Sequence, residues 1–171
     1  MRWLGRPRAK VAVCRDPLLG RVAAALDWGQ IEAVLDRYQG MIDVYILCID
    51  RDGQSGRRQR LDNIEAKAGE KLKSGRIFLG EHAIEELEVW VLAGHDLDAS
   101  WTQIRGEISV KERYYVPLAR KRGVIDHLFE GREVLSDEAA RRYSRVRDPC
   151  KEDVQNLEGR LAAAPNKSAA S

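Results

Sequence analysis

The clearest pattern of hydrophobic and polar positions lies at residues 42–53, where an apolar run ends abruptly in two acidic residues. Apart from Asp43, residues 42–49 are aliphatic or aromatic, with one cysteine. A run this short and this apolar predicts a strand buried on both faces, of the kind found at the centre of a parallel α/β sheet. Asp50 and Asp52 follow directly, so we expect them at the carboxyl end of that strand, where open α/β sheets bind ligands.

Four further segments extend this strand into an alternating pattern. Residues 10–14 are a short apolar run that predicts a first strand, and residues 28–38 carry apolar positions at helical spacing. Residues 57–73 are charged except for a narrow apolar stripe, which is typical of an exposed amphipathic helix, and residues 76–79 predict another strand. The order strand, helix, strand, helix, strand favours an α/β fold with a mostly parallel sheet flanked by helices.

The last third of the chain is predicted to be helical. Residues 136–146 and 148–163 predict two helices, the first capped by Ser136 and the second by Asp148, with Pro149 at its first position. Both are expected to be packing elements.

The length favours a single domain. With 171 residues, of which 44% are hydrophobic, the chain is long enough to bury one core. We therefore expect one α/β domain over residues 1–164, with a helical extension from about residue 100 to residue 164. Residues 165–171 are small and polar and are expected to be a disordered tail.

The acidic residues after the strand suggest metal chemistry. Side chains two residues apart on a strand point to the same side, so Asp50 and Asp52 would present their carboxylates together. Two hard oxygen donors at one sheet edge suit Mg²⁺ or Mn²⁺. The alternative is structural, because Asp and Gly are favoured in turns and residues 50–53 are also typical of a turn.

Glu88 is a third acidic candidate. Residues 81–94 predict a helix that ends at Gly94, and Glu88 falls close to its apolar side. A carboxylate there is costly unless it is paired or bound to a metal. Glu88 is therefore expected either to form a salt bridge or to join Asp50 and Asp52 at the same edge of the sheet.

Charge and cysteine content narrow the class of protein. The 29 basic and 27 acidic residues give a net charge of only +2, so any nucleic-acid affinity must come from local patches. The three cysteines are far apart and match no metal spacing, which favours a reducing cytoplasm. No apolar run is long enough to span a membrane and no glycine pattern matches a P-loop, so we expect a cytoplasmic protein that does not itself bind ATP.

The acidic motif and the segment around Glu88 together resemble a known family. Asp50-Arg51-Asp52-Gly53, followed after a helix and a strand by residues 83–94 with the pattern Glu-x-Trp-x-Leu-Ala, resembles Toprim-related proteins of the DUF4276 type. These are related to the nuclease domain of overcoming-lysogenisation-defect (OLD) proteins. The resemblance covers about residues 10–161.

The resemblance implies a Toprim-like fold in which acidic residues hold a divalent cation. Proteins of this kind cut or rejoin phosphodiester bonds, often beside a separate ATPase subunit in bacterial defence loci. It implies that Asp50, Asp52 and Glu88 are metal ligands and catalytic residues, with Mg²⁺ or Mn²⁺ as the cofactor. Three basic residues near the motif are then candidates for nucleic-acid binding: Arg51, Arg57 and Arg58. Lys111 is a fourth, because it resembles the Lys that follows the Trp segment in this family. For the arginines the alternative is a solvated helix face, because acidic residues are interspersed among them.

The chain departs from the family pattern at its start. The Toprim pattern opens with a strand that ends in a catalytic Glu, and residues 1–10 do not match that strand. Our hypothesis is that the sequence begins at an internal Met and lacks this strand and this Glu, which would impair activity. A missing strand would also expose a sheet edge, so we expect poor solubility or a homodimer.

Three functions remain open from the sequence. The first is a divalent-metal-dependent nuclease of bacterial defence type, and the second is a non-catalytic Toprim-fold interaction subunit of an ATPase-containing complex. A third, a receiver-like or hydrolase domain, would also use a strand-terminal Asp pair, but needs a Ser or Thr and a Lys on later strands that the sequence does not supply convincingly. A complete acidic site would distinguish the first from the second.

Overall fold

The computed structural model describes residues 9–16, 19–73 and 75–164. The chain divides into two compact units, and each unit is assembled from separate segments. The first unit consists of Met1–Cys48, Gly56–Glu81 and Leu157–Ser171, and the second of Ile49–Ser55 and His82–Asn156. The chain therefore passes between the units several times.

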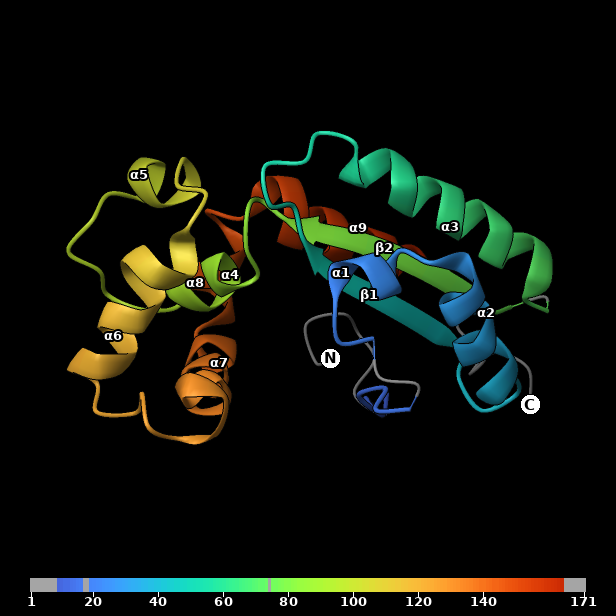
Figure 1. Ribbon diagram of the computed structural model, residues 1–171, viewed down its shortest axis with the longest axis horizontal. Helices are drawn as coiled ribbons and strands as arrows, with labels where there is room; N and C mark the ends of the chain where they lie inside the picture. The colour runs from blue at the N-terminus through green and yellow to red at the C-terminus, as the bar shows by residue number, and fades with distance from the viewer. Residues whose placement is uncertain (1–8, 17–18, 74, 165–171) are drawn as a thin grey trace. The chain divides into compact units, whose positions relative to one another are not determined.

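The first unit is built on a two-stranded parallel sheet with flanking helices (Figure 1). The strands are β1 (Val44–Asp50) and β2 (Ile77–Ala83), and the helices are α1 (Val22–Ala25), α2 (Trp28–Arg37), α3 (Arg57–Lys71) and α9 (Asn156–Ala163). Apolar side chains from α2, β1, α3 and β2 form its core: Ile31, Val34, Leu35, Tyr45, Ile64, Ala68, Leu72 and Phe78. The mixed α/β character expected from the sequence is confirmed.

Both amphipathic helices of this unit form where their apolar spacing predicts them. The backbone N–H of Gln30 donates to the Asp27 side chain at 3.0 Å, which caps the first turn of α2. Ile31, Val34 and Leu35 then face the core, and Leu61, Ile64 and Ala68 are the buried residues of α3. The remaining faces of α3 are charged, as the narrow stripe predicts.

The predicted strand at residues 10–14 is wrong. These residues have no regular secondary structure, and Val11 and Val13 are 71% and 79% exposed. An apolar run becomes a strand only where a neighbouring strand satisfies its backbone groups, and the sheet of the described chain consists of β1 and β2. Of the expected three strands, the described chain forms two, β1 and β2, which α3 connects.

The second unit is helical apart from the ends of the two strands. Its elements are α4 (Glu88–Leu92), α5 (Trp101–Arg105), the π-helix η2 (Lys111–Tyr115), α6 (Val116–Lys121), the 3₁₀-helix η3 (Leu128–Gly131), α7 (Arg132–Arg141), α8 (Tyr143–Arg147) and the π-helix η4 (Lys151–Gln155). They share a core that includes Val89, Leu92, Ile104, Val110, Tyr115, Leu118 and Leu135. Tyr115 is completely buried, so it belongs to the core and not to a surface that stacks on bases.

Three predicted helix boundaries are wrong in this unit. Residues 81–83 belong to β2, and Glu85 has a positive φ of 67°, so the predicted helix over residues 81–94 is helical only from Glu88 to Leu92. Ser136 is no cap, because α7 begins four residues earlier at Arg132. Asp148 ends α8 instead of starting the following helix. In the first case a strand occupies the start of the predicted helix, and in the other two a helix begins or ends at a different residue from the one that the capping signal indicates.

Candidate functional site

Glu85 joins the loops that follow the two strands. The backbone N–H groups of Arg51 and Asp52 donate to its carbonyl oxygen at 2.8 and 3.1 Å. Its buried carboxylate accepts the N–H of Gly53 at 2.7 Å and forms an ion pair with the Arg51 guanidinium. The chain after β1 is therefore fixed against the chain after β2.

Asp50, the last residue of β1, is tied to the start of α4. Its Oδ1 accepts the backbone N–H of Leu87 at 2.7 Å. Glu88 is the next residue and begins α4, with only 8% of its surface exposed. This hydrogen bond holds Asp50 beside the residue that precedes Glu88.

A hollow of about 340 Å³ lies beside these carboxylates. It is lined by Asp50, Leu87, Glu88, Val91, Arg132 and Ser136. Arg132 and Ser136 are four residues apart on α7 and so share one face of that helix. The hollow thus combines two acids, one base and one hydroxyl with an apolar wall.

Arg132 neutralises Glu88. Its Nε and Nη2 donate to Glu88 Oε1 at 3.0 and 2.5 Å. Its guanidinium also lies 3.4 Å from Glu130 Oε2 and over the ring of Tyr115, 5.8 Å from the ring centroid. The salt-bridge alternative for Glu88 is therefore correct in this structure.

The acidic groups around the hollow disfavour one another's ionisation. Burial raises the pKa of Asp50, and the charges of Glu88 and Asp52 raise it further, against the Leu87 N–H and Arg132, which lower it. Burial likewise raises the pKa of Glu86, whose neighbours include Glu88 and Asp50. Negative charge is in excess here even with Arg132 present.

The structure brings Asp50 and Glu88 together but sets Asp52 apart. Asp52 is exposed, has a positive φ of 50° and is not part of the hollow's lining. The chain turns after Asp50 instead of continuing as a strand, so the two-residue repeat that would align the carboxylates does not apply. The charge of Asp52 raises the pKa of Asp50.

Sequence reasoning missed Glu86 and Arg132. Glu86 accepts the backbone N–H of Lys111 at 2.5 Å, which ties the acidic loop to η2. Its place next to the predicted Glu88 was an available signal. Arg132 lies 44 residues from Glu88 in a charged segment, and nothing in the local pattern distinguishes it from a solvated arginine.

Three of the basic residues predicted to bind nucleic acid are paired within the protein. Arg51 pairs with Glu85, and the Lys111 ammonium lies 3.0 Å from Glu130. Arg58 contacts Asp62, Glu65 and Glu81. Arg57 is the first residue of α3.

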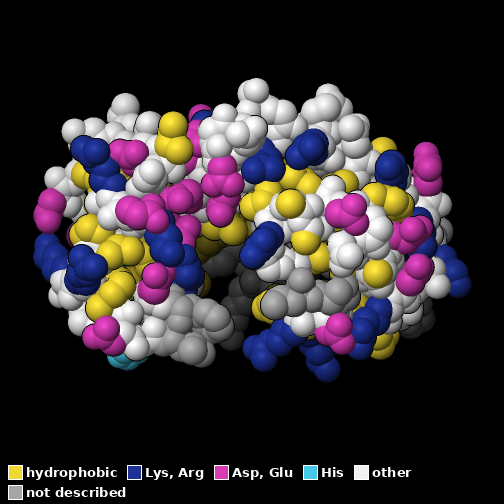
Figure 2. Space-filling model, in the orientation of Figure 1, with side chains coloured by type: hydrophobic (Ala, Val, Ile, Leu, Met, Phe, Trp, Pro, Cys, Tyr) yellow, Lys and Arg dark blue, Asp and Glu magenta, His cyan; other side chains and the backbone are white. Residues whose placement is uncertain are grey.

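Basic and acidic side chains are interspersed on the face shown in Figure 2, in keeping with the small net charge. Binding of nucleic acid by these residues stays a prediction.

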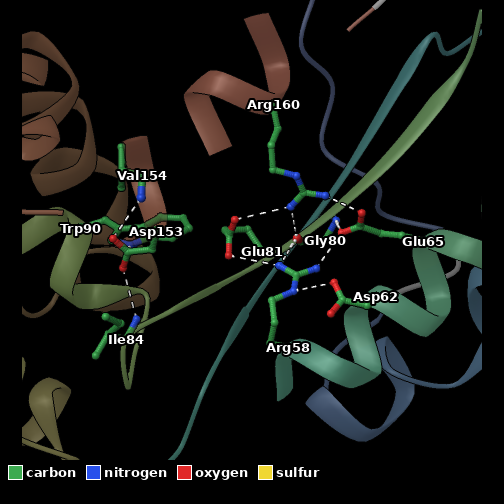
Figure 3. A network of polar contacts seen from close by, with 10 residues as sticks. All are labelled: Arg58, Asp62, Glu65, Gly80, Glu81, Ile84, Trp90, Asp153, Val154 and Arg160. Carbon is green, nitrogen blue, oxygen red and sulfur yellow. Dashed lines mark hydrogen bonds and ion pairs between the residues drawn. The ribbon is translucent and has the colours of Figure 1, made fainter. Parts of the chain in front are cut away.

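The contacts of Arg58 belong to a network inside the first unit (Figure 3). Arg58 and Arg160 both donate to the carbonyl oxygen of Gly80 at 2.9 Å. Both also pair with Glu65 and with Glu81, which is 2% exposed. The two arginines therefore compensate the buried charge of Glu81 inside the first unit.

The buried thiols are unsuited to nucleophilic chemistry. Within the described residues, none of Cys14, Cys48 and Cys150 forms a disulfide. Burial raises the pKa of the Cys48 thiol to about 11 and that of Cys150 to about 12. A thiol becomes a good nucleophile when its pKa is lowered, so neither of these is activated.

The site fits a cation that needs few protein ligands. Among the described residues, no group of three or more His, Cys, Asp or Glu side chains is arranged to hold a metal ion. The hydrogen bonds of Asp50 and Glu88 use one oxygen each, Oδ1 and Oε1. Mg²⁺ commonly binds through one or two carboxylates and completes its shell with water and phosphate, so Asp50 and Glu88 together suit it.

Comparison with protein-family models, with curated proteins and with solved structures finds no match to this chain. Within the part of the chain that the structure describes, no helix is both long enough and apolar enough to cross a membrane.

Proposed function

We propose that this protein is a divalent-metal-dependent phosphodiester-processing protein of the Toprim-like kind, with its site in the hollow beside Asp50 and Glu88. The observation that supports this most is the clustering of Asp50, Glu86 and Glu88, with burial and mutual repulsion raising the pKa of Asp50 and Glu86. A divalent cation would relieve that repulsion.

The residues of the hollow have distinct roles in this proposal. Asp50 and Glu88 would hold the cation, and the hydrogen bond from Leu87 to Asp50 keeps the first carboxylate oriented. When bound, the cation would polarise the phosphodiester and lower the pKa of a bound water. The apolar wall formed by Leu87 and Val91 would limit the access of other water.

Calorimetric titration of Mg²⁺ and Mn²⁺ tests the proposal directly. Asp50→Asn keeps an oxygen that can accept from Leu87 but removes the charge, so it should weaken cation binding by more than about tenfold. Asp98→Asn is the matched control, because Asp98 is 94% exposed and pairs only with the exposed Lys121. Cleavage of labelled DNA and RNA oligonucleotides should depend on the cation and be lost in Asp50→Asn alone.

A second candidate, the non-catalytic interaction subunit of an ATPase-containing complex, is favoured by a different observation. Arg132 already pairs with Glu88, so this carboxylate has a positive partner without a cation. The same titration separates the two functions. If neither cation binds the wild-type protein, the metal-dependent proposal is wrong and the interaction subunit becomes the better account.

A further inference from the structure

We infer that Arg132 is the phosphate-binding residue of this site, and that it exchanges Glu88 for a phosphodiester of the substrate when a divalent cation binds. This inference rests on the proposed function and adds the residue that recognises the substrate's backbone.

Arg132 is presented to the hollow by the start of α7. Gly131 precedes it with a positive φ of 73°, a conformation that favours glycine and turns the chain sharply into the helix. The Arg132 side chain then lines the hollow together with Asp50 and Glu88. Its side chain is 39% exposed, against 10% for that of Glu88, so a ligand in the hollow can reach it.

The pairing of Arg132 with Glu88 compensates a nearly buried carboxylate. Leaving such a carboxylate without a positive partner is strongly unfavourable, which explains why an arginine is needed there in the absence of another cation. A divalent ion on Asp50 and Glu88 would supply more charge at the same place and would repel the guanidinium. Breaking the ion pair between Arg132 and Glu88 is therefore favourable only when the divalent ion is bound.

Two further contacts would keep the Arg132 guanidinium beside the hollow after its ion pair with Glu88 breaks. Glu130 lies 3.4 Å from its guanidinium, and the ring of Tyr115 lies under it at 5.8 Å. A planar guanidinium held in this way can donate two parallel hydrogen bonds to a phosphate. The ligand chemistry is the phosphodiester backbone, which DNA and RNA share.

Substituting Arg132 should raise the affinity for the divalent cation and lower the affinity for an oligonucleotide. Arg132→Gln removes the competing charge from Glu88, so Mn²⁺ alone should bind the variant more tightly than the wild-type protein. A fluorescein-labelled single-stranded hexanucleotide, measured by anisotropy with Ca²⁺ present, should bind at least about tenfold more weakly, since hydrogen bonds to charged groups are among the stronger ones. DNA and RNA hexanucleotides distinguish the two substrate sources.

Two further variants complete the experiment. Arg122→Gln is the matched control, because Arg122 pairs with Glu138 at 2.8 Å, is similarly exposed and does not line the hollow. Arg132→Lys keeps the charge but loses the planar fork, so it should restore the wild-type Mn²⁺ affinity without restoring hexanucleotide binding. It also provides the test if Arg132→Gln does not fold.

The outcomes separate this inference from the proposed function. Weaker Mn²⁺ binding in both Arg132 variants would make Arg132 a structural residue only, and unchanged binding of both ligands would remove it from the site. Either result overturns the inference while leaving the metal proposal intact. Failure of the wild-type protein to bind Mn²⁺ or Ca²⁺ would overturn both.

Discussion

Asp50 couples the candidate site to the stability of the fold. Burial and the charges of Glu88 and Asp52 raise its pKa in the folded protein. An acid whose pKa is higher in the folded state than the roughly 3.9 of an unfolded Asp stabilises the fold when protonated. That contribution is complete below the unfolded pKa and is lost as pH rises through the folded pKa.

Removing the Asp50 charge should therefore stabilise the protein at neutral pH. Asp50→Asn should melt at a higher temperature than the wild-type protein at about pH 7.5. The difference should be smaller at about pH 4, because lowering the pH protonates more of the wild-type carboxyl. Scanning calorimetry in a cation-free buffer measures both. A gain of equal size at the two pH values, or an equal gain in the exposed Asp98→Asn control, would contradict the expectation.

At the scale of elements, Asp153 holds the start of α4 in place (Figure 3). It is 1% exposed, and its Oδ2 accepts from Trp90 Nε1 at 2.8 Å, Ile84 N–H at 3.2 Å and Arg105 Nη1 at 2.9 Å. Burial alone would raise the pKa of Asp153, but the hydrogen bonds from Trp90, Arg105 and the Val154 N–H and the charge of Arg105 lower it. Asp153 thereby positions the loop that carries Glu86 and Glu88.

Removal of this carboxylate should be costly. Asp153→Ala leaves the mostly buried Arg105 without its inner partner and should cost about 3–5 kcal/mol of unfolding free energy. Glu152 is the outer partner of the same arginine, and its side chain is 72% exposed. Glu152→Ala should therefore cost only about 0–1 kcal/mol of unfolding free energy. Urea unfolding of both variants gives the comparison. Equal losses would show that Asp153 is not the anchor of α4.

The contact between α4 and α7 depends on a glycine. A Cβ at Gly94, two residues after α4, would lie 2.5 Å from Cα and Cβ of Ala139 in α7. Gly94→Ala should therefore destabilise the protein by about 1–3 kcal/mol. Gly69→Ala is the control on α3, where a Cβ meets nothing within 4 Å and a gain of roughly 0.5–1 kcal/mol is expected. A harmless Gly94→Ala in urea unfolding would refute this close packing.

The elements that sequence analysis predicted are those whose signal is local. The apolar spacing of α2 and α3 and the apolar run of β1 are sufficient to predict these three elements. The expectation that β1 is buried on both faces was wrong, because Ile46 is 42% exposed and the sheet of the described chain consists of β1 and β2 alone. The strand at residues 10–14 was wrong because a strand needs a partner strand to pair with, which the apolar run itself does not supply. The cap at Ser136 was wrong because α7 begins four residues earlier, at Arg132. In the site, Asp50 and Glu88 follow from strand ends, whereas Arg132 is 44 residues from its partner and carries no local signal.

At the scale of the whole molecule, the site residues all belong to the second unit. Cation binding stabilises the conformations that bind it, so it should slow amide exchange locally. Hydrogen–deuterium exchange with and without Mn²⁺ should show protection at Leu87 and in α4 and α7, with α2 and α3 unchanged. Protection confined to the first unit would place the cation elsewhere.

The arginine at position 160 also bears on the order in which the protein can mature during synthesis. Arg160 comes from the last helix of the described chain, yet it pairs with Glu65 and Glu81 in the first unit. The second unit ends at Asn156, so all of its segments leave the ribosome before that arginine does. The first unit is therefore begun first on the ribosome, but it can form its Arg160 ion pairs only after the whole second unit has been synthesised.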